Sequence, residues 1–265
     1  MPRQRIGDIE IYYEIHGDGP QTLVMIRGLG SNLTAWYEQV PEFSRHFRVV
    51  VFDNRGAGRT DKPDAPYSLR QMADETAGLM DALGVRRAAL LGISMGGMIA
   101  QEFALAHQAK LSCLILGCTT FGGVEAVRAA PEVMEALVAG ENANAEQRRI
   151  RQRSAFTDTA IENRLEIVEK DERIRMQYLI PQFAYQRQID AAMKYDVSKR
   201  LGEIHLPTMV MTGRDDILVP PENARLIAAR IPGAKLVELP GGHLFFTEYP
   251  AEFNAAVIEF VKAHK

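Results

Sequence analysis

The chain has 265 residues, of which 46% are hydrophobic and 25% charged, and its formal net charge is −3. This is the composition of an ordinary globular protein and argues against a disordered chain. The mildly acidic balance gives no electrostatic footprint for nucleic acid, so we expect no nucleic-acid partner. The apolar runs are far shorter than the roughly 20 residues that a membrane span requires, so we expect no membrane association.

The N-terminus and the cysteines bear on the compartment. The first five residues are not followed by the apolar core of a signal peptide. Cys113 and Cys118 fall in one apolar run that predicts a strand, where their odd separation directs the side chains to opposite faces. We therefore expect no disulfide between them, a reducing compartment, and a soluble cytoplasmic protein.

The first half of the chain alternates between strand and helix patterns. A strand is predicted over 9–15, and short apolar runs bounded by glycine or polar residues follow at 23–26, 49–52, 88–91 and 111–116. Continuous apolar runs are typical of strands buried on both faces of a parallel sheet. Strands that alternate with helices predict a parallel α/β sheet with right-handed crossovers.

Two helices are predicted between these strands. Ser68 and Gln71 have the spacing of a capping box, and the apolar periodicity that follows ends at Gly84. A second helix is predicted over about 96–107.

The pattern changes near residue 121. We find no strand pattern from 121 to 200, where the sequence is charged and helical, and strand signals return at 208–211 and 235–239 before a closing helix over 250–264. We interpret 121–200 as a helical cap, or lid, inserted over the end of a sheet. The core that carries the sheet would then comprise residues 1–120 and 201–265.

One motif in the first half carries chemistry. Gly92-Ile93-Ser94-Met95-Gly96 lies directly between a predicted strand and a predicted helix. A nucleophilic serine on a strained strand-to-helix turn leaves little room beside it, which suits glycine at both flanking positions. The alternative is a tight turn with an incidental serine; the strand–turn–helix context favours the nucleophile.

A nucleophilic serine requires a base that is oriented by an acid. Of the six histidines, only His243 follows a predicted strand and precedes a helix, in Pro240-Gly241-Gly242-His243. Ligands bind in loops at the carboxyl ends of parallel strands, so we assign His243 as the general base. The loop after the preceding strand offers two acids, Asp215 and Asp216.

These motifs resemble the α/β-hydrolase fold family, in particular its lidded esterases and 3-oxoadipate enol-lactonase-like serine hydrolases. The resemblance covers about residues 6–120 and 200–262 and rests on four segments: Arg27-Gly28-Leu29-Gly30, residues 53–60, residues 92–97, and 213–216 with 242–243. It implies a mostly parallel eight-stranded sheet flanked by helices, with an inserted helical cap. It also implies Asp216 as the acid, and an oxyanion hole made by the backbone N–H groups of Leu29 and Met95.

The chain departs from these relatives at one position. They usually carry His-Gly where this chain has Arg27-Gly28. A permanent cation there would bias the site toward anionic substrates. The alternative, which we favour at this stage, is an ion pair between Arg27 and a local carboxylate such as Asp53, because structural ion pairs are common.

Several other side chains are candidates for substrate contact or for packing. We predict that the substrate contacts some of Arg27, Trp36, Phe121, Met134, Phe183 and Leu244. The basic run from Arg148 to Arg153 and the charged stretch around Asp171 are interpreted as solvated faces of cap helices.

The sequence therefore predicts a serine hydrolase that cleaves a small carboxylic ester or (enol-)lactone through Ser94, His243 and Asp216. We expect no metal, no organic cofactor, and a monomer or dimer whose partner is its small-molecule substrate. Two enzymatic alternatives keep the same triad: a carbon–carbon bond hydrolase and a cofactor-free haloperoxidase or perhydrolase. An alternative of another class is a small-molecule receptor of the same fold that does not turn over its ligand.

Overall fold

A computed structural model describes residues 2–265 of the chain and contains an eight-stranded sheet. The strands are β1 (Arg3–Ile6), β2 (Ile9–His16), β3 (Thr22–Ile26), β4 (Arg48–Phe52), β5 (Ala88–Ile93), β6 (Leu111–Gly117), β7 (Thr208–Gly213) and β8 (Lys235–Leu239). Their order across the sheet is β1-β2-β4-β3-β5-β6-β7-β8. Pairs that involve β1 or β2 are antiparallel, and the strands β3 to β8 are parallel to one another. The predicted mostly parallel eight-stranded sheet is confirmed.

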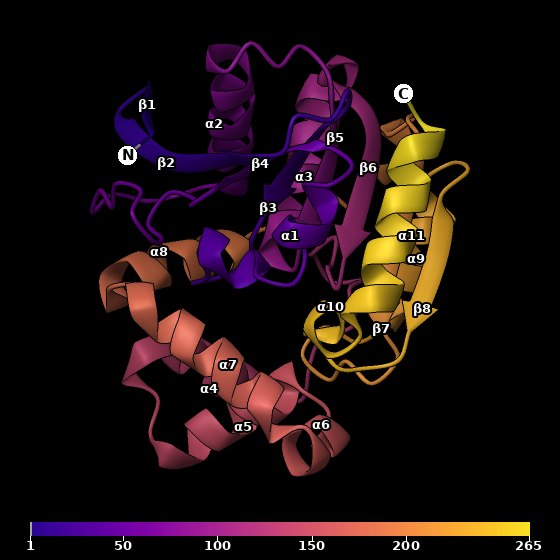
Figure 1. Cartoon of the computed structure of the whole chain (residues 1–265). Helices are drawn as coiled ribbons and strands as arrows, with labels where there is room; N and C mark the ends of the chain where they lie inside the picture. Colours follow the sequence, from indigo (N-terminus) through magenta and orange to yellow (C-terminus); the bar gives the residue numbers. More distant parts are fainter. Residues whose placement is uncertain (1) are drawn as a thin grey trace.

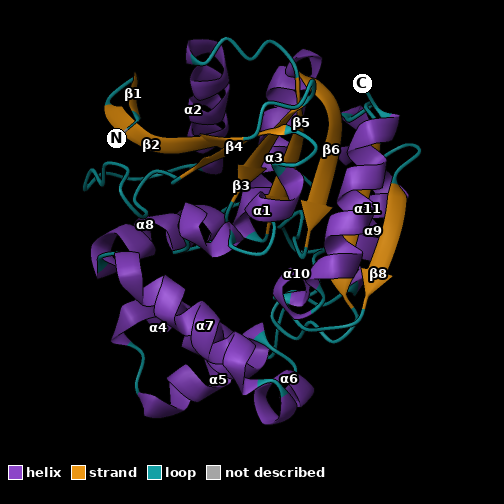
Figure 2. Cartoon of the chain, in the orientation of Figure 1, coloured by secondary structure: helices purple, strands orange, loops and turns teal. Residues whose placement is uncertain are grey.

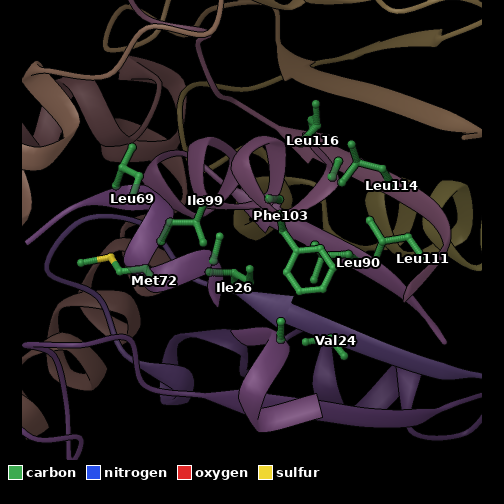
Figure 3. Close-up of a cluster of buried hydrophobic side chains, with 14 of the residues drawn as sticks. Val24, Ile26, Leu69, Met72, Leu90, Ile99, Phe103, Leu111, Leu114 and Leu116 are labelled. Atoms are coloured by element: carbon green, nitrogen blue, oxygen red, sulfur yellow. The ribbon is translucent and has the colours of Figure 1, made fainter. Parts of the chain in front are cut away.

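Helices cover both faces of this sheet. On one face lie α2 (Leu69–Ala82), α3 (Met95–His107) and α9 (Glu222–Arg230). On the other face lie α1 (Val40–Phe43), α10 (Phe245–Glu248) and α11 (Pro250–Ala263), together with the short 3₁₀ helix η1 (Leu33–Trp36). Figure 3 shows Val24, Ile26 and Leu90 of the sheet packed beneath side chains of α2 and α3.

The parallel strands are buried on both sides, which explains their continuous apolar runs. In β3, Val24 and Ile26 join the core beneath α2 and α3, whereas Leu23 and Met25 join the core beneath α11. Each of these four side chains is at most 1% exposed. Removing this apolar area from water contributes on the order of 25 cal/mol per Å². The residue types at the centre of the sheet are therefore set by burial on two faces.

The helix boundaries follow local signals in the sequence. The Ser68 hydroxyl accepts a hydrogen bond of 3.1 Å from the backbone N–H of Gln71 at the start of α2. Gly84, beyond the end of α2, has a φ of +68°, a conformation that favours glycine. Both ends of this helix were predicted.

Between β6 and β7 the chain forms five helices: α4 (Pro131–Ala139), α5 (Ala145–Ala155), α6 (Asp158–Asn163), α7 (Leu165–Arg175) and α8 (Gln182–Met193). We call residues 131–193 the α4–α8 segment. In Figure 1 its helices α4 to α7 lie below the sheet, on the side toward which the arrows of β3 and β6 point. Figure 2 shows only helices and loops in this part of the chain. The absence of a strand pattern in this region correctly predicted helices.

Candidate active site

Ser94 occupies a sharp turn between β5 and α3. Its φ of +57° and ψ of −122° are unusual for a residue that bears a side chain. Two hydrogen bonds hold this backbone: the Ser94 N–H donates to the Gly117 carbonyl at 2.9 Å, and the Thr119 hydroxyl donates to the Ser94 carbonyl at 2.7 Å. Strain of this kind, held by its surroundings, is typical of a functional position.

The glycines on either side of Ser94 allow the backbone segments to approach closely. A Cβ at Gly92 would lie 2.2 Å from the Gly96 carbonyl oxygen, and a Cβ at Gly96 would lie 2.3 Å from the Ile26 carbonyl oxygen. The turn therefore packs directly against β3, and both glycines of the motif are required sterically.

We expect Gly96→Ala to destabilise the protein by about 1–3 kcal/mol, because the new methyl group overlaps the β3 backbone. Hydrolytic activity should fall with it, since β3 leads into the loop beside Ser94. Thermal melting and initial rates measure the two effects. The matched control is Gly202→Ala, whose new Cβ would meet only the Arg230 carbonyl oxygen at 3.9 Å. Equal melting temperatures for the two variants would contradict this account of the turn.

The acid and the base predicted from the sequence lie together. His243 Nδ1 and Asp216 Oδ2 are 2.8 Å apart, and both residues are buried. The other Asp216 oxygen accepts backbone N–H groups of Leu218 at 2.9 Å and Val219 at 2.8 Å. Asp215 is exposed and makes no such contact. The carboxylate of Asp216 is therefore fixed on both oxygens and oriented toward the imidazole.

Glu248 holds the loop that carries His243, a role that no sequence pattern indicates. Its buried carboxylate accepts the Gly242 N–H at 2.8 Å and the Thr157 hydroxyl at 2.6 Å. The Leu244 N–H donates to the Ala155 carbonyl at 2.8 Å. These contacts join the histidine loop to the junction of α5 and α6.

The loop after β3 lies directly against Ser94. A Cβ at Gly28 would be 3.0 Å from Ser94 Cβ and 3.4 Å from Ser94 Oγ. Among the hydrogen bonds of residues 2–265, none uses the backbone N–H of Leu29 or Met95 as donor. Both groups, predicted to form the oxyanion hole, are thus available beside the serine.

A side chain of α8 supports this loop from the opposite side. Gln188 is fully buried; its Oε1 accepts the Gly30 N–H at 2.9 Å, and its Nε2 donates to the Arg55 carbonyl at 2.8 Å. Gln188 was not predicted as a site residue, because a single glutamine in a helical pattern gives no sign that it is buried.

A cavity of about 810 Å³ connects these parts. Ser94 and His243 both line it, although no hydrogen bond joins the Ser94 hydroxyl to the imidazole in the described structure. Of the other predicted site residues, the cavity is also lined by Leu29, Met95, Arg27, Met134 and Leu244. Its volume suits a small organic molecule.

Three predicted substrate contacts lie elsewhere. Phe121 is fully buried in the core, with the Arg230 guanidinium over its ring at 4.5 Å. Phe183 is 41% exposed on α8 and is absent from the cavity wall. Trp36 is buried behind the wall, where it stacks on Arg27. Spacing along a helix could not tell a cavity-facing aromatic side chain from a packing or surface one.

The favoured interpretation of Arg27 as a partner of Asp53 is wrong. Asp53 instead accepts the backbone N–H groups of Leu33 and Arg59, each at 2.7 Å, and lies 3.5 Å from the Arg59 side chain. Arg27 donates to the Ser31 hydroxyl at 3.1 Å and forms no ion pair with any described carboxylate. Its charge therefore requires another explanation.

Three further features of the described residues concern metal ligands, membrane-spanning helices and cysteines. Within residues 2–265, no group of three or more His, Cys, Asp or Glu side chains is arranged to hold a metal ion. In the same range, no helix combines the length and apolar character needed to cross a bilayer. Cys113 and Cys118 are both free, as predicted, and both are buried.

The fold and the strained serine turn at the end of β5 define a protein of the α/β-hydrolase class. The comparisons with known proteins agree: residues 21–250 match the family model described as "alpha/beta hydrolase fold". The chain belongs to this family and is a hydrolase.

Its relatives carry several different names. The chain is 32% identical over 279 residues to "Putative carbamate hydrolase RutD" of Caulobacter sp. (strain K31), with 95% of each chain covered. It resembles the enol-lactonase of Burkholderia xenovorans LB400, with a TM-score of 0.86, 26% identity, and coverage of 98% of this chain and 100% of that one. It also resembles a malate-bound thermophilic esterase from Thermogutta terrifontis, with a TM-score of 0.86, 27% identity and full coverage of both chains. The names agree on hydrolysis but not on the substrate.

Proposed function

We propose that the protein is a serine hydrolase that cleaves a small carboxylic ester or lactone through an acyl-enzyme. One observation carries the proposal: the hydrogen-bonded pair of Asp216 and His243 opens onto the same cavity as Ser94, which stands on a strained turn. A serine, a base and an acid in this relation are the parts that nucleophilic acyl transfer requires.

The proposed mechanism begins with the tautomer of His243. Asp216 accepts the Nδ1–H of the imidazole at 2.8 Å, which leaves Nε2 free to accept the proton of the Ser94 hydroxyl. The serine oxygen then attacks the acyl carbon. The negative charge that develops on the carbonyl oxygen would be stabilised by the N–H groups of Leu29 and Met95, which are fixed before the reaction begins.

The second half of the cycle reverses the proton transfer. His243 gives its proton to the leaving alcohol, and an acyl group remains on Ser94. A water molecule then loses a proton to His243 and attacks the acyl carbon. His243 returns this proton to the Ser94 oxygen as the acid leaves, so that the serine hydroxyl is regenerated.

We further propose that residues 121–200 act as a cap over this reaction. Side chains of α4, α5, α7 and α8 form much of the cavity wall. The contacts of Gln188 and Glu248 tie this segment to the loops that carry the oxyanion donors and the base. A cap of this kind would exclude bulk water and position the substrate.

Carbamate hydrolysis is the second candidate, and the names of the curated relatives favour it. A carbamate also presents a carbonyl carbon to the serine, so the same residues would serve. The two functions differ in the acyl group that is transferred to the serine and, as a result, in the stability of the acyl-enzyme.

A panel of substrates tests the proposed function. We expect multiple turnovers on short p-nitrophenyl esters or small lactones, with carbamates slower, because a carbamoyl-enzyme loses its acyl group slowly. The control is the same panel with Ser94→Ala. Faster turnover of carbamates than of esters would favour the second candidate. A protein that binds its ligand but stops after about one turnover per molecule would instead be a receptor.

A further inference from the structure

Arg27 is a buried cation without an ionic partner, close to the proposed nucleophile. It stands between the last residue of β3 and Gly28, the residue that lies against Ser94. Arg27 is only 5% exposed, and its Nη1 has no hydrogen-bond partner among the described residues. Burial of a charge without a partner is costly, and buried charges are normally paired. The fold therefore maintains at this point a cation whose partner is not supplied by the chain.

The aromatic neighbours of Arg27 fix its position. Its guanidinium carbon lies 4.7 Å from the ring centroid of Trp36 and 5.1 Å from that of Phe246. The indole nitrogen of Trp36 is a second buried donor without a partner. Stacking on aromatic faces holds the planar guanidinium in place, so little side-chain freedom is left to lose when an acceptor binds.

An opposing charge in the cavity wall comes from the α4–α8 segment. Asp171 of α7 lines the same cavity as Arg27, but among the described residues the two side chains form no ion pair or hydrogen bond. Burial raises the pKa of the Asp171 carboxyl above its ordinary value, because a buried carboxylate is poorly solvated. Asp171 accepts no hydrogen bond from Arg27, so the Nη1 donor of Arg27 stays unoccupied.

The rest of the cavity wall is also predominantly basic. Its charged side chains are three carboxylates, Glu141, Asp171 and Glu172, and six arginines: Arg27, Arg128, Arg148, Arg149, Arg151 and Arg175. This excess of positive charge contrasts with the net charge of −3 on the whole chain. A cleft with an excess of positive charge raises the local concentration of anionic ligands.

We propose that Arg27 anchors a carboxylate subsite within the active-site cavity, so that the preferred substrate is an ester or lactone with a second, free carboxylate. This inference rests on the proposed hydrolase function and names its substrate class. The free carboxylate accepts hydrogen bonds from the guanidinium of Arg27. Because Arg27 is adjacent to Gly28, such a contact would also position the acyl carbon near Ser94.

Matched substrates test the subsite kinetically. The pair is p-nitrophenyl hydrogen glutarate, which is anionic, and p-nitrophenyl pentanoate, which is neutral. We expect Arg27→Met to lower kcat/KM for the anionic ester by about 100-fold and to change the neutral ester by less than about threefold, since one desolvated charge pair is lost. Arg27→Lys should be intermediate, because it keeps the charge but not the planar fork. Arg45→Met, an exposed arginine outside the cavity, is the control for net charge.

Asp171→Asn should act in the opposite direction. It removes the negative charge that faces Arg27, so we expect about a tenfold gain in kcat/KM for the anionic ester. If Asp171 served instead as the permanent partner of Arg27, this variant would lose activity and stability, and the proposal would be wrong.

A binding measurement separates this inference from the proposed function. Calorimetry with glutarate on Ser94→Ala and on Ser94→Ala/Arg27→Met needs no turnover, and we expect the second variant to bind about 100-fold more weakly. Equal binding by the two variants would overturn the subsite even if esters are hydrolysed. Loss of binding in a protein that hydrolyses none of the panel would support the subsite and refute the proposed function. Thermal melting guards against misfolding: the melting temperature of Arg27→Met should stay equal or rise, since an unpaired buried charge is removed.

Discussion

Ser94→Ala is expected to lower kcat on an ester substrate by a factor on the order of 10⁶, while the protein stays folded. The hydroxyl is the proposed nucleophile, and no other serine or threonine stands on the strained turn. The serine backbone bonds to Gly117 and Thr119 do not involve the hydroxyl, so the turn should persist in the variant. Steady-state kinetics and a melting curve on the same preparation measure both effects.

The residual activity of Ser94→Ala is also informative. Oxyanion donors and substrate binding alone retain some acceleration over water in enzymes of this kind. An activity of Ser94→Ala above about a tenth of the wild-type activity would exceed this residual acceleration and contradict the assignment of Ser94 as nucleophile.

Asp216→Asn is expected to lower kcat by about 10⁴-fold, whereas Asp215→Asn should have little effect. An amide at position 216 would donate to His243 Nδ1 and stabilise the wrong tautomer, in which Nε2 carries the proton. Asp215 is exposed and its side chain contacts no residue of the proposed triad, so it is the matched control. Equal losses in the two variants, or a larger loss in Asp215→Asn, would contradict the role of Asp216.

Much of the fold could be predicted because burial leaves a clear pattern in the sequence. The parallel strands β3 to β7 are apolar on both faces, and the helix α2 carries its own start and stop signals at Ser68 and Gly84. The strand β1 was missed. It is a short polar strand at the edge of the sheet, paired only with β2, so it has no buried face to impose an apolar pattern.

The candidate site was predicted where a residue type is tied to a turn or a loop. The glycines around Ser94, and the loop that carries His243, satisfy local steric rules that can be recognised in a sequence. The choice of Asp216 as the partner of His243 was implied by the resemblance to the family, and the structure brings the two side chains together.

Residues that act through long-range burial could not be predicted. Asp171 belongs to a charged stretch typical of a solvated helix, and the packing of α7 against η1 brings it to the wall of the cavity that Arg27 also lines. The same limitation explains the error about Asp53, whose carboxylate accepts hydrogen bonds from the backbone of Leu33 and Arg59 instead. Aromatic spacing likewise misplaced Phe121 and Phe183, whose orientation depends on how the helices pack.

In the proposed mechanism, the Ser94 hydroxyl becomes covalently acylated or phosphorylated because His243 removes its proton. Intact and peptide mass spectrometry after treatment with diethyl p-nitrophenyl phosphate tests this directly. We expect one diethylphosphoryl group per chain, attached to Ser94, with labelling abolished in Ser94→Ala and strongly slowed in His243→Ala. Stoichiometric labelling at another residue, or undiminished labelling of His243→Ala, would contradict it.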